Sequence, residues 1–346
     1  MAPALHSRRP ASYDRHVNSP DATALAGTRS RHDLEAEVES HRRELTAYCY
    51  RMLGSNLEAD DAVQDTMVRA WRSLDGFEGR SSLRSWLYRI ATNVCIDMTR
   101  GPQRRARPMD LSPASTADSY LAPGLPEETW ITPVQDLRVV PVDGDPAEVA
   151  AGRESIRLAF VAALQHLPAR QRATLILCEV LKWQATEVAE LLDTTVASVN
   201  SALQRARATL ATVDLDGPAP GLGADDTDLL ARYVDAFERY DVPSLVALLR
   251  DDVKFNMPPY PLWLLGADQV AAWLAGPGIG CANGKILPAG FANGCPAFGS
   301  YRIDPAGGYS PWSFIVLEID DGQIVGWNNF LGPAQFAAFG LPPHLD

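Results

Sequence analysis

The segment 84–105 places its apolar residues on one side of a helix. They recur at steps of three and four residues, at Leu87, Ile90, Ala91, Val94 and Met98, which is the spacing of a single buried stripe. Gly101-Pro102 then ends the helix. A second stripe upstream follows the same rule at Val63, Met67, Ala70 and Leu74. Residues 32–105 are therefore predicted to be helical throughout.

A second helical block covers residues 151–213 and contains a helix–turn–helix pattern. The first helix of the pair would pack through Val188, Ala189 and Leu192, and the second through Val199 and Leu203. Between them, Asp193-Thr194 is predicted to form the turn, at a position where glycine is usual, and Thr195 to cap the second helix. The spacing is typical of a DNA-binding motif, although many helical pairs share it.

The last third of the chain changes to an α+β pattern. Helices are expected from Asp228 to about Tyr240 and again from Val242. Short alternating stretches at 253–257, 313–319 and 323–330 read as strands. The last two are joined by Asp320-Asp321-Gly322, which predicts a β-hairpin with a tight turn.

Proline content and charge divide the chain into segments. We expect an unstructured arm at 1–31, a helical domain at 32–107, a proline-rich linker at 108–152, a second helical domain at 153–213, a short linker at 214–226 and a tail domain at 227–346. The formal net charge is −12. It is unevenly spread, because the linker 108–152 has eight acidic residues and one basic residue, while both helical domains are slightly basic. Such a pattern is compatible with nucleic-acid binding by the helical domains.

Three polar helix faces contain the candidate binding residues. Arg89, Asn93 and Arg100 lie opposite the buried stripe of their helix, and Gln103, Arg104, Arg105 and Arg107 are expected to continue outward from its end. This side is either a solvated face or a phosphate-contacting surface. A second face carries Asp61, Gln64 and Asp65, which suits a basic protein partner or solvent. On the third, short polar residues suit the major groove and arginines suit phosphates, at Ala197, Ser198, Asn200, Ser201, Gln204, Arg205 and Arg207.

The sequence also limits the cellular setting. It has no apolar run long enough to cross a membrane and no hydrophobic signal core at its start, so a cytoplasmic, soluble protein without a membrane partner is expected. Cys281 and Cys295 lie in one loop-rich stretch and could pair, but a reduced state fits the five unpatterned cysteines better. We expect no metal or cofactor.

Taken together, the two helical blocks resemble an extracytoplasmic-function (ECF) sigma-70 family factor, a subunit that directs bacterial RNA polymerase to promoters. The stretch from "RRELTAYCYRMLG" to "ATNVCIDMTR" is similar to sigma region 2, and "LPARQRATLILCEV…RARATL" is similar to sigma region 4. The whole chain is similar to the SigG-like branch, whose members add a SnoaL-like domain of the NTF2 fold. Within the linker, "TWITPVQD" resembles a Trp-Leu-x-Pro-x-Pro-Asp motif, with Ile131 and Gln135 departing from it.

The resemblance implies a multi-domain architecture, with two all-α sigma domains and a C-terminal α+β cone. It also implies partners: core RNA polymerase, through its β′ and β subunits, and promoter DNA. Asp61, Gln64 and Asp65 would bind the β′ clamp helices, and the loop 77–86 would capture a flipped base of the −10 element.

The melted −10 strand would meet a basic surface with aromatic platforms, for which Trp86 and Tyr88 are candidates. The −10 contacts implied are Arg84, Trp86, Arg89, Asn93, Arg100, Arg104 and Arg105. Region 4 would read the −35 duplex. The acidic linker would thread a polymerase channel built for nucleic acid.

Two other hypotheses remain open from the sequence. One is a stand-alone helix–turn–helix regulator whose tail binds a small ligand. In the tail's cone, the residues expected to help line or fill it are Trp263, Trp273, Trp312 and Trp327. The other is an NTF2-fold enzyme fused to a DNA-binding module, with acid/base groups among Asp235, Glu238 and Asp241. These three acids also fit an ordinary solvated helix face, and we expect no catalytic residue in the chain. In the favoured hypothesis, the tail regulates the sigma domains of the same chain.

Overall fold

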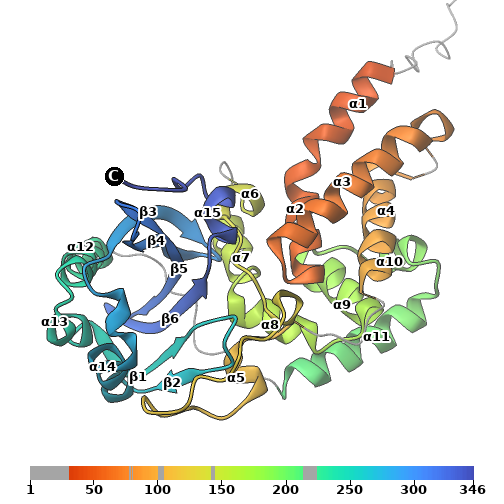
Figure 1. Cartoon of the computed structure of the whole chain (residues 1–346). Coiled ribbons are helices and arrows are strands. Elements are labelled where there is room, and N and C mark those ends of the chain that lie inside the picture. Colours follow the sequence, from red (N-terminus) through yellow and green to blue (C-terminus); the bar gives the residue numbers. More distant parts are fainter. Residues whose placement is uncertain (1–30, 78, 80, 100–104, 142–144, 213–223) are drawn as a thin grey trace, which may run out of the picture.

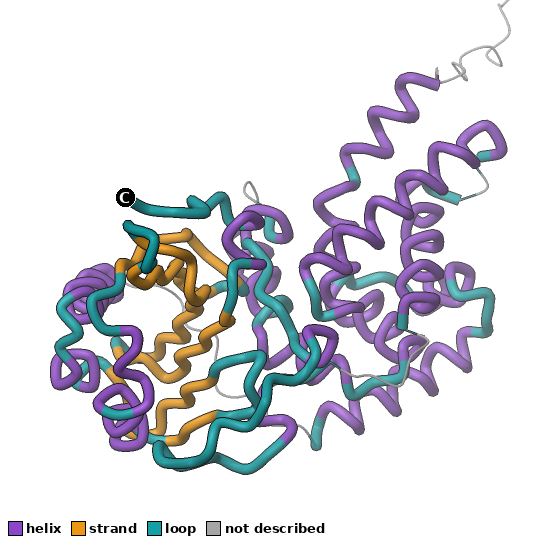
Figure 2. Tube along the Cα trace, viewed as in Figure 1, coloured by secondary structure: helices purple, strands orange, loops and turns teal. Residues whose placement is uncertain are grey.

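The computed structural model has a helical half and a half built on a β-sheet (Figure 1). It describes residues 31–77, 79, 81–99, 105–141, 145–212 and 224–346. The predicted arm at 1–30 and most of the short linker at 214–226 lie outside these residues. Figure 2 shows that strands are confined to the tail domain, whereas helices make up the other half of the molecule.

The first helical domain is built from α1 (Arg31–Ser40), α2 (Arg42–Leu53), α3 (Asn56–Ser73), a 3₁₀ turn η1 (Leu74–Gly76) and α4 (Leu83–Met98). Two serines begin its helices as side-chain caps: Ser55 Oγ accepts from the Glu58 amide and Ser82 Oγ accepts from the Ser85 amide. The predicted stripe of α4 is buried at Leu87, Ala91 and Val94. Met98, at the last turn, is 42% exposed.

The second helical domain contains α8 (Leu158–Gln165), α9 (Ala169–Leu175), a π-helical turn η3 (Ile176–Val180), α10 (Ala185–Leu191) and α11 (Val196–Leu210). The predicted turn is confirmed, because Asp193 has a φ of +50° in the left-handed region. Thr195 caps α11 by accepting from the Ser198 amide, and Val199 is buried beneath it.

The tail domain wraps a curved six-stranded sheet around helices and forms the expected α+β cone. The strand order is β2-β1-β6-β5-β4-β3, and among these pairs β1 and β6 are parallel. The strands are β1 (Leu249–Asn256), β2 (Trp263–Leu265), β3 (Lys285–Ala292), β4 (Cys295–Ile303), β5 (Tyr309–Asp320) and β6 (Gln323–Leu331). The helices are α12 (Ala224–Glu238), α13 (Val242–Val246), α14 (Ala267–Ala275), η4 (Pro277–Cys281) and α15 (Ala334–Ala338).

Both faces of this sheet are buried, and they belong to different cores. On β5, Ile315 and Leu317 point into the cone and pack with the helices α12 to α14. Their neighbours Phe314 and Val316 point the other way and join the same apolar cluster as the helical domains. The tail is therefore fused to the helical half through a continuous core.

Two of the tail's hairpins end in the same kind of turn. The predicted one between β5 and β6 turns at Asp321-Gly322, with φ of +49° and +68°. The one between β3 and β4 turns at Asn293-Gly294, with φ of +54° and +79°. The β3–β4 hairpin was not predicted, although Asn-Gly is a strong hairpin signal.

The linker 108–152 is not a free tether, since it lies along the tail. Its short helices are α5 (Pro108–Leu111), η2 (Glu127–Thr129), α6 (Asp136–Val139) and α7 (Pro146–Glu154), the last of which crosses the predicted boundary at 152. Near its start, the Ser115 amide donates to the Trp263 carbonyl of edge strand β2 at 2.8 Å. Near its end, Gln135 pairs with Ala292 of edge strand β3. The linker thus contacts both edges of the sheet, which would otherwise be open to pairing.

Candidate nucleic-acid interface

The acidic face of α3 is accessible to a partner. Asp61 and Gln64 are exposed and Asp65 is half-buried, with an ion pair from Asp65 to Arg69 at 2.7 Å on the same helix. The structure therefore places the three residues together, as predicted. The linker borders this face, because Arg138 forms an ion pair with Asp60.

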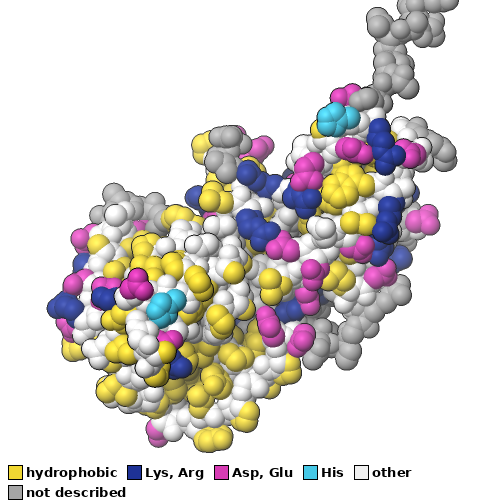
Figure 3. Space-filling model, turned by 45° about the horizontal axis from the view of Figure 1, so that its top comes forward, with side chains coloured by type: hydrophobic (Ala, Val, Ile, Leu, Met, Phe, Trp, Pro, Cys, Tyr) yellow, Lys and Arg dark blue, Asp and Glu magenta, His cyan; other side chains and the backbone are white. Residues whose placement is uncertain are grey.

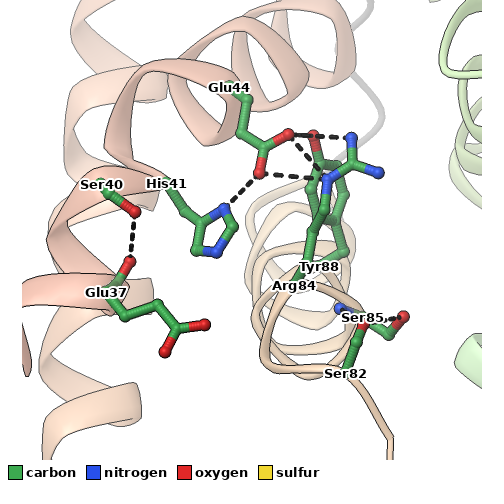
Figure 4. Close-up of polar contacts among 8 residues, drawn as sticks. All are labelled: Glu37, Ser40, His41, Glu44, Ser82, Arg84, Ser85 and Tyr88. Atoms are coloured by element: carbon green, nitrogen blue, oxygen red, sulfur yellow. Dashed lines mark hydrogen bonds and ion pairs between the residues drawn. The ribbon is translucent and has the colours of Figure 1, made fainter. Parts of the chain in front are cut away.

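On α4, the residues predicted to meet the −10 strand have different surroundings. Arg89 and Asn93 are exposed, whereas Arg84 is half-buried and forms an ion pair with Glu44 at 2.8 Å. Glu44 also accepts from the Tyr88 hydroxyl at 3.2 Å and contacts Nδ1 of His41 at 2.5 Å. Figure 4 shows these side chains converging on the Glu44 carboxylate from α2 and α4.

The two aromatic platforms predicted from the sequence are not equally available. Tyr88 is fully buried, so the prediction that it stacks with a base is wrong for this state. Burial raises the pKa of its hydroxyl above the ordinary value. Trp86 is half-buried and packs on Phe77 with ring centroids 5.2 Å apart.

The prediction that Arg105 and Arg107 continue outward from the helix is also wrong. Both are only 9% exposed. The Arg105 guanidinium forms an ion pair with Glu58 at 2.6 Å and donates to the Trp130 carbonyl at 2.7 Å. Folding of the linker onto the first helical domain supplies these partners, which local periodicity could not reveal. Arg100 and Arg104 lie outside the described residues.

The predicted −35 face on α11 is open. All seven residues of that prediction, from Ala197 to Arg207, are exposed. Arg207 also reaches back to Glu179 as an ion pair. The short polar side chains at the start of α11 can therefore approach base edges without any rearrangement of the domain.

The two helical domains pack directly against each other, through residues that the sequence analysis missed. Trp183, from the loop before α10, stacks on Tyr88 at 5.1 Å and lies under the Arg84 guanidinium at 5.1 Å. Arg89 donates to the Glu190 carbonyl at 2.7 Å. The contact occupies part of the predicted −10 surface. The one sequence signal that could have indicated this contact is a tryptophan, Trp183, directly before the helix–turn–helix.

A buried arginine on α2 strengthens the same domain contact. Arg51 is 4% exposed and donates to Ser155 Oγ at 2.7 Å. Burial lowers the pKa of Arg51 to about 10. Beside this contact, a cleft of about 990 Å³ is lined by α2, α7 and the loop after η3. In the view of Figure 3, basic and acidic side chains are interspersed over the helical half, while apolar side chains cover much of the tail.

The cone of the tail is filled rather than hollow. Trp273, Trp312 and Trp327 line a cavity of about 40 Å³, far below the 300 Å³ or more typical of a ligand pocket. Trp263 does not line it, and its indole instead donates to the Ser112 carbonyl of the linker at 2.8 Å. The expectation of a cone lined by all four tryptophans is therefore wrong for Trp263.

The three acids considered as acid/base groups have structural surroundings. Asp235 pairs with Arg239 on the surface, Asp241 caps α13 through the Ser244 amide, and Glu238 lies 4.0 Å from Lys285. Cys281 and Cys295 are both free thiols. Across the residues that the structure describes, no group of His, Cys, Asp and Glu could hold a metal ion. None of the helices within those ranges is long and apolar enough to span a membrane.

Comparison with known proteins accounts for both helical domains. Residues 38–105 match the family model of Sigma-70 region 2, and residues 157–210 match that of Sigma-70, region 4. An acidic helix face in one domain and an open helix–turn–helix in the other therefore belong to a sigma factor, the promoter-recognition subunit of bacterial RNA polymerase.

The ECF RNA polymerase sigma factor SigG of Mycobacterium tuberculosis (strain ATCC 25618 / H37Rv) is 42% identical over 91% of this chain and 85% of the relative. The chain belongs to the ECF family of sigma factors. SigJ from the same strain is 27% identical over 88% of this chain and 94% of its own. The crystal structure of SigJ matches with a TM-score of 0.55 at 21% identity, covering 89% of this chain and 99% of that one, which indicates a shared fold that includes the tail.

Proposed function

We propose that this sigma factor is held in a closed state by its own tail and that polymerase binding opens it. In the open state the acidic face of α3 docks on the β′ clamp helices, α4 meets the melted −10 strand and α11 reads the −35 duplex. The tail acts on the same chain and performs no chemistry. The observation that carries this proposal is the direct packing of Trp183 against the predicted −10 surface.

The spacing of promoter elements requires the two domains to separate. Elements named for positions −35 and −10 lie about 25 base pairs apart, or roughly 85 Å along B-form DNA at 3.4 Å per pair. Domains whose Tyr88 and Trp183 rings are 5.1 Å apart cannot occupy both elements at once. The linker 108–152 could extend to roughly 150 Å once it is free, so it is long enough to allow this separation.

The acidic face of α3 remains exposed in the closed state, which suggests an order of events. Polymerase would first dock on Asp61, Gln64 and Asp65, and opening would follow. An exposed acidic face also favours rapid, salt-sensitive association with a basic partner. The tail's cavity of about 40 Å³ gives no support to a small ligand as the trigger.

Reconstituted initiation with core polymerase tests the docking step. Charge reversal of Asp61 and Asp65 to Lys should weaken polymerase binding at least tenfold and abolish promoter-dependent transcripts. The matched control is Asp228→Lys on α12, an exposed acid of the tail, which should leave both unchanged. Polymerase affinity that is equal in the charge-reversed and wild-type proteins would reject the proposed docking face.

A further inference from the structure

The turn between β3 and β4 reaches out of the tail and contacts three other parts of the chain. Asn293, at its tip, is fully buried although it begins a two-residue hairpin turn. Its surroundings are Tyr50 of α2, Val134 of the linker and Ile156 of the second helical domain. A turn residue is usually exposed, so this burial marks an interface.

The side chain of Asn293 uses both of its donors and its acceptor oxygen across that interface. Its Nδ2 donates to the Tyr50 hydroxyl at 2.7 Å and to the Ile156 carbonyl at 2.5 Å. Its Oδ1 accepts from the Val134 amide at 2.9 Å. The backbone amide of Asn293 donates to the Val134 carbonyl at 3.1 Å. A fully satisfied buried network specifies one arrangement, because any shift leaves polar groups unpaired.

The neighbouring residues extend the same contact. The Gly294 amide donates to Asp136 Oδ1 at 2.9 Å, and the backbone of Gly294 lies against Arg153, because a Cβ at Gly294 would be 3.5 Å from the Arg153 side chain, an ordinary contact. Tyr50 in turn donates to the Thr132 carbonyl at 2.9 Å. One turn of the tail therefore joins the linker to both helical domains.

We propose that this turn is the latch of the closed state: Asn293 and Gly294 lock the linker segment 132–136 and the two helical domains together, and the latch must be released before the domains can separate. The inference deepens the proposed function, since it identifies the contact through which the tail controls opening. Polymerase would release the latch by competing for the linker.

The chain offers a matched pair of substitutions to test this latch. Asn293 and Asp321 both occupy the first position of a two-residue turn followed by glycine, and both Asn and Asp suit that position. Asn293→Asp keeps the turn but replaces the Nδ2 donor by a carboxylate oxygen facing the Ile156 carbonyl. Asp321→Asn makes the reverse exchange in the exposed β5–β6 turn, away from the helical domains.

Hydrogen exchange on the full-length free protein measures the latch without polymerase. Asn293→Asp should raise the exchange of peptides covering 130–136 by at least 10-fold, because two buried hydrogen bonds are lost and a charge is buried. Peptides from α2 and α3 and from the cone core should keep their protection. Asp321→Asn should exchange like the wild type. Unchanged exchange of 130–136 in Asn293→Asp would overturn the proposal.

A second variant addresses the risk that Asn293→Asp misfolds the tail. Tyr50→Phe removes the hydroxyl that links Asn293 and Thr132 while leaving the tail sequence intact, and Tyr301→Phe is its control, since the Tyr301 hydroxyl bonds to the Pro342 carbonyl within the tail. Faster exchange of 130–136 in Tyr50→Phe alone supports the latch, and equal exchange in both variants opposes it.

Measuring the affinity of the latch variants for core polymerase distinguishes the latch itself from its proposed role in regulation. If the latch variants expose 130–136 and bind core polymerase at least tenfold more tightly, both proposals stand. If they expose this segment but neither bind more tightly nor transcribe more, the latch stands and regulation by the tail fails.

Discussion

The two surfaces that we propose read DNA differ in their accessibility. On α11, the residues predicted to read the −35 element are all exposed. At the −10 surface, Arg84 is tied to Glu44 and Trp183, Arg89 contacts Glu190, and Arg105 is buried against the linker. In the proposed closed state, promoter melting would therefore be withheld while duplex recognition would not. Regulation by the tail is therefore expected to act on the −10 step.

Removal of the tail should have the largest effect on the difference in accessibility between the −10 and −35 surfaces. Truncation after Leu210 takes away the sheet whose two edges hold the linker and whose outer face shares the core of the helical domains. We expect the linker to become fully sensitive to limited proteolysis, while binding to a −35 duplex changes less than twofold. A truncated chain whose linker resists protease as well as the intact protein does would contradict the account.

Loss of Trp183 should have the second-largest effect on the difference between the covered −10 surface and the open −35 surface. Trp183→Ala removes a nearly buried ring from Tyr88 and Arg84, which should favour the open state by about 3 kcal/mol. Binding of a −10 single strand should then increase, as measured by fluorescence anisotropy. Asn200→Ala on the open α11 face serves as the control, because it should weaken duplex binding and leave strand binding unchanged.

Substitution of Arg105 tests whether this residue stabilises the free protein or is an exposed DNA contact. Arg105→Ala leaves Glu58 and the Trp130 carbonyl without their partner, which should lower the free energy of unfolding of the free protein by about 1–3 kcal/mol. Chemical denaturation measures this directly. A free protein as stable as the wild type would restore the original prediction of an outward-facing arginine.

The smallest expected effect is a pH dependence at Asp136. Burial raises the pKa of this carboxyl above its ordinary value, opposed by the Gly294 amide and Arg153. The closed state therefore binds the proton more tightly than the open state, so closing is favoured below the ordinary pKa and this contribution is lost as pH rises through the raised pKa. Asp136→Asn should remove this dependence in hydrogen exchange of 130–136. An identical pH profile in the variant would exclude Asp136 as its source.

The local elements were predictable because their signals are local. The stripes of α3 and α4, the left-handed Asp193 and the hairpin at Asp321-Gly322 follow from spacing and turn chemistry alone. The placement of Asp61, Gln64 and Asp65 on one accessible face followed in the same way. The β3–β4 hairpin was missed even though Asn293-Gly294 marked its turn. The sequence of β3 (KILPAGFA) contains a proline and a glycine and shows no regular alternation of apolar and polar residues, and β4 is buried on both faces over most of its length.

What could not be predicted depends on contacts between distant segments. Arg105 follows a helix and reads as an exposed cation, until the linker folds back and brings the Trp130 carbonyl to it. Trp183 was given no role from the sequence, and its tilted contact with Tyr88 requires the two domains to meet. No periodicity encodes such pairings, since they form between segments that are far apart in the sequence.

The most direct test of the central claim is the distance between the two helical domains. Fluorescent labels at Ser73 and Ala208, both exposed, would report it by energy transfer in the free protein and in a promoter complex with core polymerase. The account predicts a short distance in the free protein and a separation larger by tens of ångströms in the complex, as promoter spacing requires. An unchanged distance in a transcriptionally active complex would contradict it.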